Sequence, residues 1–238
     1  MIRIAKLPVA AANSIAHFHQ GPSTMNAKVD RFAPRSDADL LRLVQQQPLA
    51  WVVSGSVAED SYRSTLLPIL AAADADGHLV LEGHFARSND QYKLLMQNPK
   101  AVMLVLGTNG YISPSWMQDK TQAPTWNYAS VQFFVDVEFF EQPEAIEAHL
   151  RELVNTMEKQ TPRSSTAAAW KVDDMGARYG SLAQRVIGFR ARVRNVRAKF
   201  KLGQDERDDV FADIMIGLSE AGRAELHAWM REFNSGRG

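Results

Sequence analysis

The alternation of apolar and polar positions along the chain predicts strands with helices inserted between them. Strands are expected at about 49–54, 65–71, 78–82, 101–106 and 126–141, where apolar residues recur at a period of two or form short buried runs. Asp76-Gly77 and Asn109-Gly110 are dipeptides typical of tight hairpin turns. Each of these dipeptides is therefore expected to end a strand.

Apolar residues at helical spacing predict helices at about 36–47, 89–97, 143–157, 173–186, 206–217 and 219–234. Pro143 is expected in the first turn of its helix, where a missing backbone N–H costs little. Ser219 is expected to cap the last helix, because a serine hydroxyl can accept from the free N–H groups there.

The stretch from Phe189 to Lys201 contains a break in its alternation. Apolar residues occupy alternate positions up to Val193, and after Asn195 they continue one position out of step. One extra residue in one strand of a pair is a β-bulge, so a bulge is expected at Asn195.

The order of these elements indicates an α+β fold, an antiparallel barrel that carries inserted and C-terminal helices. Regular strand–helix alternation of the dinucleotide-binding type is absent. Residues 1–30 lack clear periodicity and are expected to form an N-terminal extension. Residues 31–238 are expected to form the barrel domain with its C-terminal helices.

Composition narrows the function classes. The 238 residues are 45% apolar and include 27 basic and 27 acidic side chains, which disfavours bulk electrostatic binding of nucleic acid. The C-terminal helices are flanked by acidic residues, the wrong sign for a DNA backbone. Cysteine is absent, which excludes disulfides, thiolate catalysis and cysteine-ligated metals. No membrane span is expected, and a cytoplasmic location is favoured.

The segment Tyr111-Ile112-Ser113-Pro114-Ser115-Trp116, with Pro124-Thr125-Trp126-Asn127-Tyr128 soon after, is nearly free of charge. It combines rigid aromatic rings with a few hydroxyl and amide groups. Such a combination suits a wall for a flat organic ligand. It also suits a hairpin whose aromatic rings fill the core, and the residues alone leave both interpretations open.

Candidate anion ligands lie in two other blocks. Gly83-His84-Phe85-Ala86-Arg87-Ser88-Asn89 stands where a strand is expected to end and a helix to begin, which suits an anion site. It suits a helix N-cap followed by a surface arginine equally well, and the residues alone leave both interpretations open. Lys199 and Lys201, past the expected bulge, are further candidates, whereas the arginines before it suit a solvated strand face. Among the histidines, His84 is the functional candidate and His149 is expected on a helix surface. His17 and His19 lack a third ligand, so no metal site is predicted.

The ordered set of motifs resembles the PaiB-like family, whose members are often labelled FMN-binding negative transcriptional regulators. The resemblance runs from about Arg31 to about Leu218. It rests on the two aromatic segments, on Gly83-His84-Phe85-Ala86-Arg87, on Gly188-Phe189 and on Lys199-Phe200-Lys201-Leu202. The chain departs from the family pattern at Leu66, where a histidine is usual, and at Gly203-Gln204-Asp205, where Ser-Gln-Asn is usual.

The resemblance implies an FMN-binding split barrel that forms a homodimer with two flavin sites at the interface. Residues near the flavin phosphate would be His84, Arg87 and Asn89. Residues that line the ring or the ribityl chain would be Tyr111, Ser113, Ser115, Trp116, Trp126, Asn127, Lys199 and Lys201.

Three functions follow from these observations. A flavin-dependent oxidoreductase acting on a small molecule is favoured, because the flavin would supply the redox chemistry. A ligand-sensing negative regulator is the alternative that the family label implies. A haem-binding split barrel, with His84 or an N-terminal histidine as axial ligand, is the second alternative.

Overall fold

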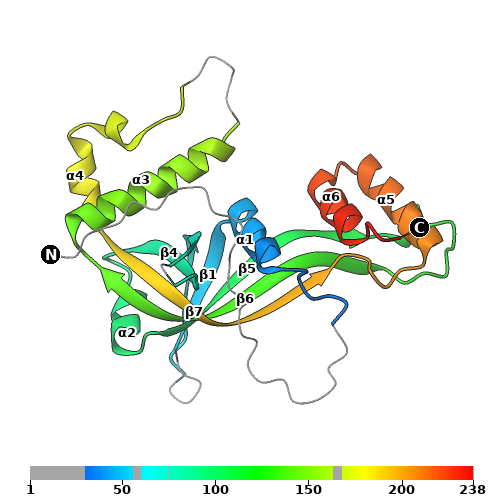
Figure 1. The fold of residues 1–238 in the computed structure, drawn as a ribbon, viewed down its shortest axis with the longest axis horizontal. Coiled ribbons are helices and arrows are strands. Elements are labelled where there is room, and N and C mark those ends of the chain that lie inside the picture. Colours follow the sequence, from blue (N-terminus) through cyan, green and yellow to red (C-terminus); the bar gives the residue numbers. More distant parts are fainter. Residues whose placement is uncertain (1–29, 56–59, 75, 163–167, 238) are drawn as a thin grey trace.

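The computed structural model describes residues 30–55, 60–74, 76–162 and 168–237. The expected N-terminal extension, with His17 and His19, therefore lies outside the described residues except for Asp30. Figure 1 shows a twisted sheet with helices at both ends and a long set of strands that projects away from the rest. Among the described residues, no helix is long and apolar enough to cross a membrane.

Seven strands form one antiparallel sheet in the order β2-β1-β5-β6-β7-β4-β3. This arrangement, together with the helices, confirms the expected α+β antiparallel barrel fold. The strands are β1 (Leu49–Ser54), β2 (Arg63–Pro68), β3 (Leu70–Ala73), β4 (Leu79–Ala86), β5 (Lys100–Ile112), β6 (Thr125–Phe140) and β7 (Val186–Lys201). The stretch expected as one strand at 65–71 is divided at Ile69, whose N–H donates to the Pro48 carbonyl.

The turn expected at Asn109-Gly110 is wrong. Both residues lie inside β5, where Asn109 pairs with Tyr128 and Gly110 with Asn127. A side chain at Gly110 would come within 2.8 Å of Leu226, so this glycine permits the close approach of a helix. The strand instead accommodates a register shift between Leu106 and Asn109 and continues to Ile112.

The bulge expected near Asn195 is confirmed. The pairing of β6 with β7 changes register between Phe134 and Val135, which are opposite Asn195 and Val193. Arg194 is thereby left without a directly opposite residue on β6. The shift keeps Phe200 buried and Lys199 and Lys201 on the other face of the strand.

The helices are α1 (Asp37–Gln46), α2 (Gln91–Gln97), α3 (Pro143–Gln160), α4 (Arg178–Ala183), α5 (Asp208–Glu220) and α6 (Ala224–Phe233). The helix expected at 173–186 is shorter: a 3-10 turn covers Val172–Met175, and β7 already begins at Val186. The expectation that Ser219 caps the last helix is wrong, because α5 continues through Ser219 and α6 begins only at Ala224.

The core lies between one face of the sheet and the helices α1, α5 and α6. Phe133, Phe189 and Phe200 from the strands are fully buried there with Trp229 from α6. Helix α3 packs at the other end of β7, where it contacts the strand and α4 (Figure 1). The sheet face away from the core is therefore covered near α3, whereas part of it is exposed near the strand tips.

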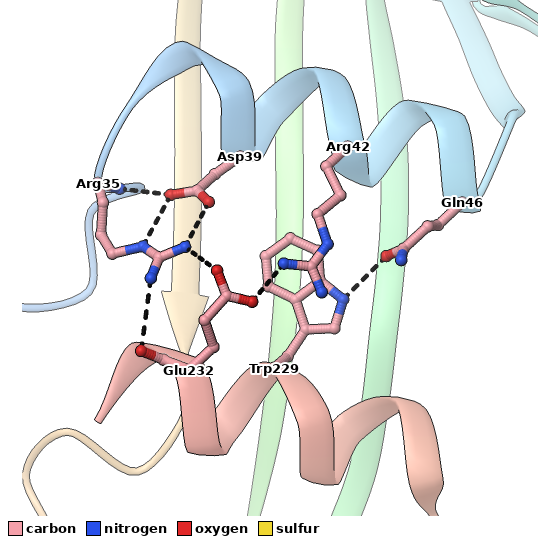
Figure 2. Close-up of polar contacts among 6 residues, drawn as sticks. All are labelled: Arg35, Asp39, Arg42, Gln46, Trp229 and Glu232. Carbon is pink, nitrogen blue, oxygen red and sulfur yellow. Dashed lines mark hydrogen bonds and ion pairs between the residues drawn. The ribbon is translucent and has the colours of Figure 1, made fainter. Parts of the chain in front are cut away.

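A network of polar contacts connects α1 to α6 (Figure 2). Glu232 accepts hydrogen bonds from Arg35 and Arg42, and the Arg42 guanidinium lies 4.0 Å from the centre of the Trp229 ring. Trp229 Nε1 donates to Gln46 Oε1 at 2.9 Å. These contacts fix the C-terminal helix against the first helix, and so hold α5 and α6 on the projecting strands.

Candidate functional site

Residues 107–112 of β5, 125–131 of β6 and 195–201 of β7 project beyond the rest of the sheet and are here called the arm (Figure 1). Tyr111 and Trp126 are opposite each other in the register of the arm, with ring centroids 6.0 Å apart and planes at 62°. Tyr111 is 45% exposed and Trp126 is 55% exposed. These two rings therefore do not fill the core, and their interpretation as a wall for a ligand remains.

Lys199 and Lys201 stand beside these rings. Directly paired residues of antiparallel strands project to the same side, and Lys201 pairs with Tyr128 while Lys199 pairs with Ser130. Tyr111, Trp126, Tyr128, Lys199 and Lys201 therefore share one side of the arm, here called the arm face.

The two lysines of the arm face make no ion pair within the part of the chain that the structure describes. Lys201 donates to the Thr125 hydroxyl, and the Lys199 ammonium lies 5.2 Å from the centre of the Phe32 ring. Arg190 and Arg194, earlier on the same strand, are by contrast paired with Glu82 and Asp136. The arm face thus combines exposed aromatic rings with two cations that can bind an anion.

The other aromatic-segment residues are placed differently. Ser113 and Ser115 share a hydrogen bond of 2.7 Å between their hydroxyls, and the Ser113 hydroxyl also accepts from the Ser115 N–H. Trp116 packs against α5, where a side chain at Gly217 would come within 2.4 Å of its ring. Asn127 is fully buried on the core side, with its amide 3.5 Å from the Met230 sulfur. Trp116 and Asn127 therefore connect the arm to α5 and α6.

His84 is on β4, beside the end of β7 that is far from the arm. It pairs with Gly188, and its Nδ1 is 3.1 Å from Nε2 of His149 on α3. His149 is only 3% exposed, so the expectation of a helix-surface histidine is wrong. Burial lowers the pKa of His84; burial first, and then the neighbouring His84, lowers the pKa of His149 to about 4. Both imidazoles are therefore neutral near neutral pH.

Arg87 and Asn89 follow His84 but contact different groups. Arg87 Nη1 donates to Glu141 at 2.8 Å, and among the described residues the other guanidinium N–H groups have no acceptor. The Asn89 amide donates to the Thr65 hydroxyl, and Asn89 Oδ1 accepts from the Gln91 N–H. Helix α2 has seven residues, so its N-terminus contributes little to anion binding.

The residues predicted from the sequence thus divide into two groups within one chain. Gly188, opposite His84, and Lys201 are both on β7. They are thirteen steps apart along the strand, which at about 3.3 Å per step corresponds to roughly 40 Å. One flavin mononucleotide cannot contact both groups in a single chain.

An exposed apolar surface lies next to the arm face. Leu66, Trp51 and Leu104 are directly opposite one another across β2, β1 and β5, and so share one side of the sheet. Leu106 is 59% exposed and Trp51 49% exposed. The residues of this surface, here called the apolar patch, are Leu49, Trp51, Leu66, Leu104 and Leu106.

A cavity of about 210 Å³ lies elsewhere, between α1, β3 and α3. Its lining is mainly apolar and includes Val44, Ile69 and Met157, with Glu82 and Glu152. None of the site residues predicted from the sequence lines it. The arm face is thus an open surface rather than an enclosed pocket.

Residues 29–195, well over half of the chain, match the family described as “Putative FMN-binding domain”. The chain belongs to this family. A Bacillus subtilis protein, “Protease synthase and sporulation protein PAI 2”, is 26% identical over 144 residues, which cover 60% of this chain and 66% of that protein. An uncharacterized protein from Emericella nidulans is 24% identical over 222 residues, covering 77% of this chain and 88% of that protein.

Solved structures agree with the membership at the level of the fold. The FAD and heme binding protein from Mycobacterium smegmatis superposes with a TM-score of 0.51 at 16% identity, covering 75% of this chain and 78% of that chain. The flavocytochrome Anf3 from Azotobacter vinelandii gives 0.50 at 12% identity, covering 75% and 74%. The expectation of a PaiB-like, FMN-binding split barrel is therefore confirmed for family and fold.

Two of the positions that depart from the usual family pattern, Leu66 and Gly203, have clear structural roles. Leu66 is 43% exposed and belongs to the apolar patch. Gly203 has a φ of +81°, and a side chain there would come within 2.9 Å of Met230. The Gln204 side chain donates to the Phe200 carbonyl and accepts from the Leu202 N–H. Gly203 and Gln204 therefore form the turn from β7 toward α5.

Proposed function

We propose that the protein is a homodimeric, FMN-dependent oxidoreductase that acts on a small molecule. In this proposal the His84 and Arg87 end of one copy meets the arm face of the second copy, and one flavin is bound between them. The observation that carries the proposal is the separation of the two groups along β7 by roughly 40 Å. In a dimer, the His84 and Arg87 end of one copy can lie beside the arm face of the other copy.

The apolar patch supports the second copy as the partner. Monomers rarely expose contiguous apolar surfaces that contain several large side chains. The patch continues along the sheet into the arm face, since Leu106 pairs with Ser130 and Ser130 pairs with Lys199. A twofold axis through the patch would bury Trp51 and Leu106 of both copies. The same contact would set each arm face against the other copy.

The residues present fit an FMN molecule. Its ring system is flat and aromatic, and Tyr111 and Trp126 offer exposed ring surface. Its phosphate is a dianion, and Lys199 and Lys201 form no ion pair among the described residues, although the positive charge of Lys201 partly offsets the rise that burial causes in the pKa of the Glu206 carboxyl. At the other end, Arg87 has N–H groups without an acceptor in the part of the chain that the structure describes. Only in the dimer can the cations of both ends act on the same flavin.

FMN, when bound, supplies hydride transfer between a donor and an acceptor. The chain contributes binding and environment. Tyr111 and Trp126 exclude water from one side of the ring, and the lysines and Arg87 balance the negative charge of the phosphate. The buried contacts of Asn127 and Trp116 with α6 and α5 keep the strands of the arm in place.

The test is spectroscopic and then kinetic. The protein as isolated, or after addition of FMN, is expected to show a bound-flavin spectrum, and reduced nicotinamide is expected to bleach it. Reoxidation by an added electron acceptor with repeated turnover would establish the oxidoreductase. Flavin binding without turnover would contradict the enzyme and favour the ligand-sensing regulator. A Soret band without flavin would favour the haem-binding alternative.

A further inference from the structure

Within the described part of the chain, one ring nitrogen of His149 has a partner and the other has none. Its Nε2 lies 3.1 Å from Nδ1 of His84, whereas its Nδ1 is buried and has no hydrogen-bond partner among the described residues. The Phe140 ring lies beside it, with centroids 6.2 Å apart. A buried polar atom without a partner is unusual in a folded protein, so its protonation is constrained.

The missing partner determines the direction of the hydrogen bond. If His84 donated, the proton of neutral His149 would be on Nδ1, which would leave a buried N–H without an acceptor. Orphaned buried N–H groups are rarer than buried acceptors without a donor. The arrangement that avoids the orphaned N–H has His149 Nε2–H donating to Nδ1 of His84. The proton of neutral His84 is then on Nε2.

Nε2 of His84 is the nitrogen that can meet a ligand. His84 is only partly buried, and its Nε2 has no protein partner among the described residues. The only buried side-chain N or O atoms without a partner among the described residues are Asn127 Oδ1 and His149 Nδ1. His84 Nε2, which also has no partner there, is therefore not buried and reaches solvent. The hydrogen bond from α3 therefore fixes which nitrogen of His84 carries the outward-facing proton.

We propose that His149 is a positioning residue that holds His84 as the neutral Nε2–H tautomer, so that His84 presents an N–H donor to an anionic group. The identity of that anion as the flavin phosphate rests on the proposed function. The tautomer rests on the geometry of this chain alone. An uncharged donor supports phosphate binding across the pH range in which a charged histidine would titrate.

Neighbouring charged groups do not set the protonation of His84 and His149. The charged residues on the elements that carry or flank the pair include Glu82 on β4, Glu138 on β6, Glu141 just after β6, Arg190 on β7, Arg87 after β4, and Glu147 and Glu152 on α3. Glu82 is paired with Arg190, and Glu141 with Arg87. Burial is the largest cause of the lowered pKa of both histidines, and the neighbouring His84 lowers the pKa of His149 further. The pair is therefore neutral and governed by its own hydrogen bond.

The experiment is long-range ¹H–¹⁵N NMR of the histidine rings in the full chain without flavin at pH 7. The wild type is expected to show His84 protonated at Nε2 and unprotonated at Nδ1. His149→Phe keeps a ring but removes the donor, so His84 is expected to become a mixture of tautomers. His149→Gln carries an amide N–H that can replace the donor, and it is expected to restore the wild-type pattern. Thermal unfolding of both variants checks that α3 remains folded.

Flavin titration of the same proteins gives the second readout. His149→Phe is expected to raise the FMN dissociation constant about tenfold, a difference of about 1.4 kcal/mol, while His149→Gln stays near the wild type. A wild-type His84 protonated at Nδ1, or a tautomer unchanged in His149→Phe, would overturn the inference. His84→Ala with unchanged FMN affinity would instead contradict the flavin site, because the NMR pattern is decided without flavin.

Discussion

Tyr111 and Trp126 are opposite each other on neighbouring strands with ring centroids 6.0 Å apart, and about half of each side chain is exposed. An edge-to-face pair of this kind is normally buried against other apolar groups. Here the core lies on the other face of the strands, where Asn127 is fully buried against the C-terminal helix. The pair is therefore available to a ligand or to a second copy.

Trp126→Ala is expected to weaken FMN binding by about 1 kcal/mol, because one aromatic contact with the ring is lost. The free energy of unfolding should change little, since Trp126 is 55% exposed. Flavin fluorescence titration measures the first quantity and chemical denaturation the second. Trp170→Ala, at a tryptophan that is 41% exposed outside the arm, is the matched control. Equal flavin affinity in both variants would remove Trp126 from the site.

Leu106→Glu is expected to convert the dimer to a monomer, because a charge would be buried in the apolar patch. Leu106 is 59% exposed in the single chain, so the monomer itself should remain folded. Light scattering coupled to size exclusion gives the mass. Ile216→Glu is a close control, since Ile216 on α5 is 58% exposed and lies outside the patch. A dimer that persists in Leu106→Glu would place the interface elsewhere.

Stability is expected to fall as the pH is lowered from about 6.5 to about 4. The pKa of His149 is about 4 in the folded state, against an ordinary histidine value of 6.5, so the unfolded chain binds more protons in this window. A difference of this size corresponds to at most about 3 kcal/mol lost by pH 4. Denaturant unfolding at several pH values should show a smaller decline in His149→Phe. An identical decline in both proteins would show that other groups govern it.

Glu232→Gln is expected to lower the free energy of unfolding by about 0.5–1 kcal/mol, with a smaller effect at high salt. Glu232 is paired with Arg35 and Arg42, and these partners lower the pKa of its carboxyl. Its side chain is 42% exposed, so solvent screens the pairs. Trp229→Ala, by comparison, removes a fully buried ring and should cost about 3–5 kcal/mol. An effect of Glu232→Gln as large as that of Trp229→Ala would contradict this ranking.

Local patterns predicted the elements whose signals agreed with their surroundings. The alternation of 126–141 and 189–201, with its slip, corresponds to β6 and the bulged β7. The proline at 143 does begin α3. Asn109-Gly110 did not form the turn that it predicts, because its turn signal is local, whereas the glycine is needed for the approach of Leu226.

The site could be predicted only in part for a similar reason. The motifs identified His84, but His149 gave no signal, because a histidine on an amphipathic helix does not reveal which neighbour it will meet. Its partner comes from a strand 65 residues away in the sequence. The separation of His84 from Lys201 follows from the length and register of β7, which sequence motifs alone do not convey.

The central claim is that each flavin is bound by two copies of the chain. Arg87→Ala and Lys201→Ala are each expected to weaken FMN binding by about 1.5–3 kcal/mol, the size of a charge-assisted contact. Each homodimer would carry the same defect in both of its sites.

The most direct measurement is FMN binding by a purified heterodimer of these two variants, obtained by co-expression with two different affinity tags. If Arg87 of one copy and Lys201 of the other share a site, the heterodimer has one intact site and one doubly altered site. The account therefore predicts about one FMN bound per heterodimer with wild-type affinity. A heterodimer in which both sites remain weakened would mean that Arg87 and Lys201 of one chain act together, or that they do not share a site, and would contradict the account.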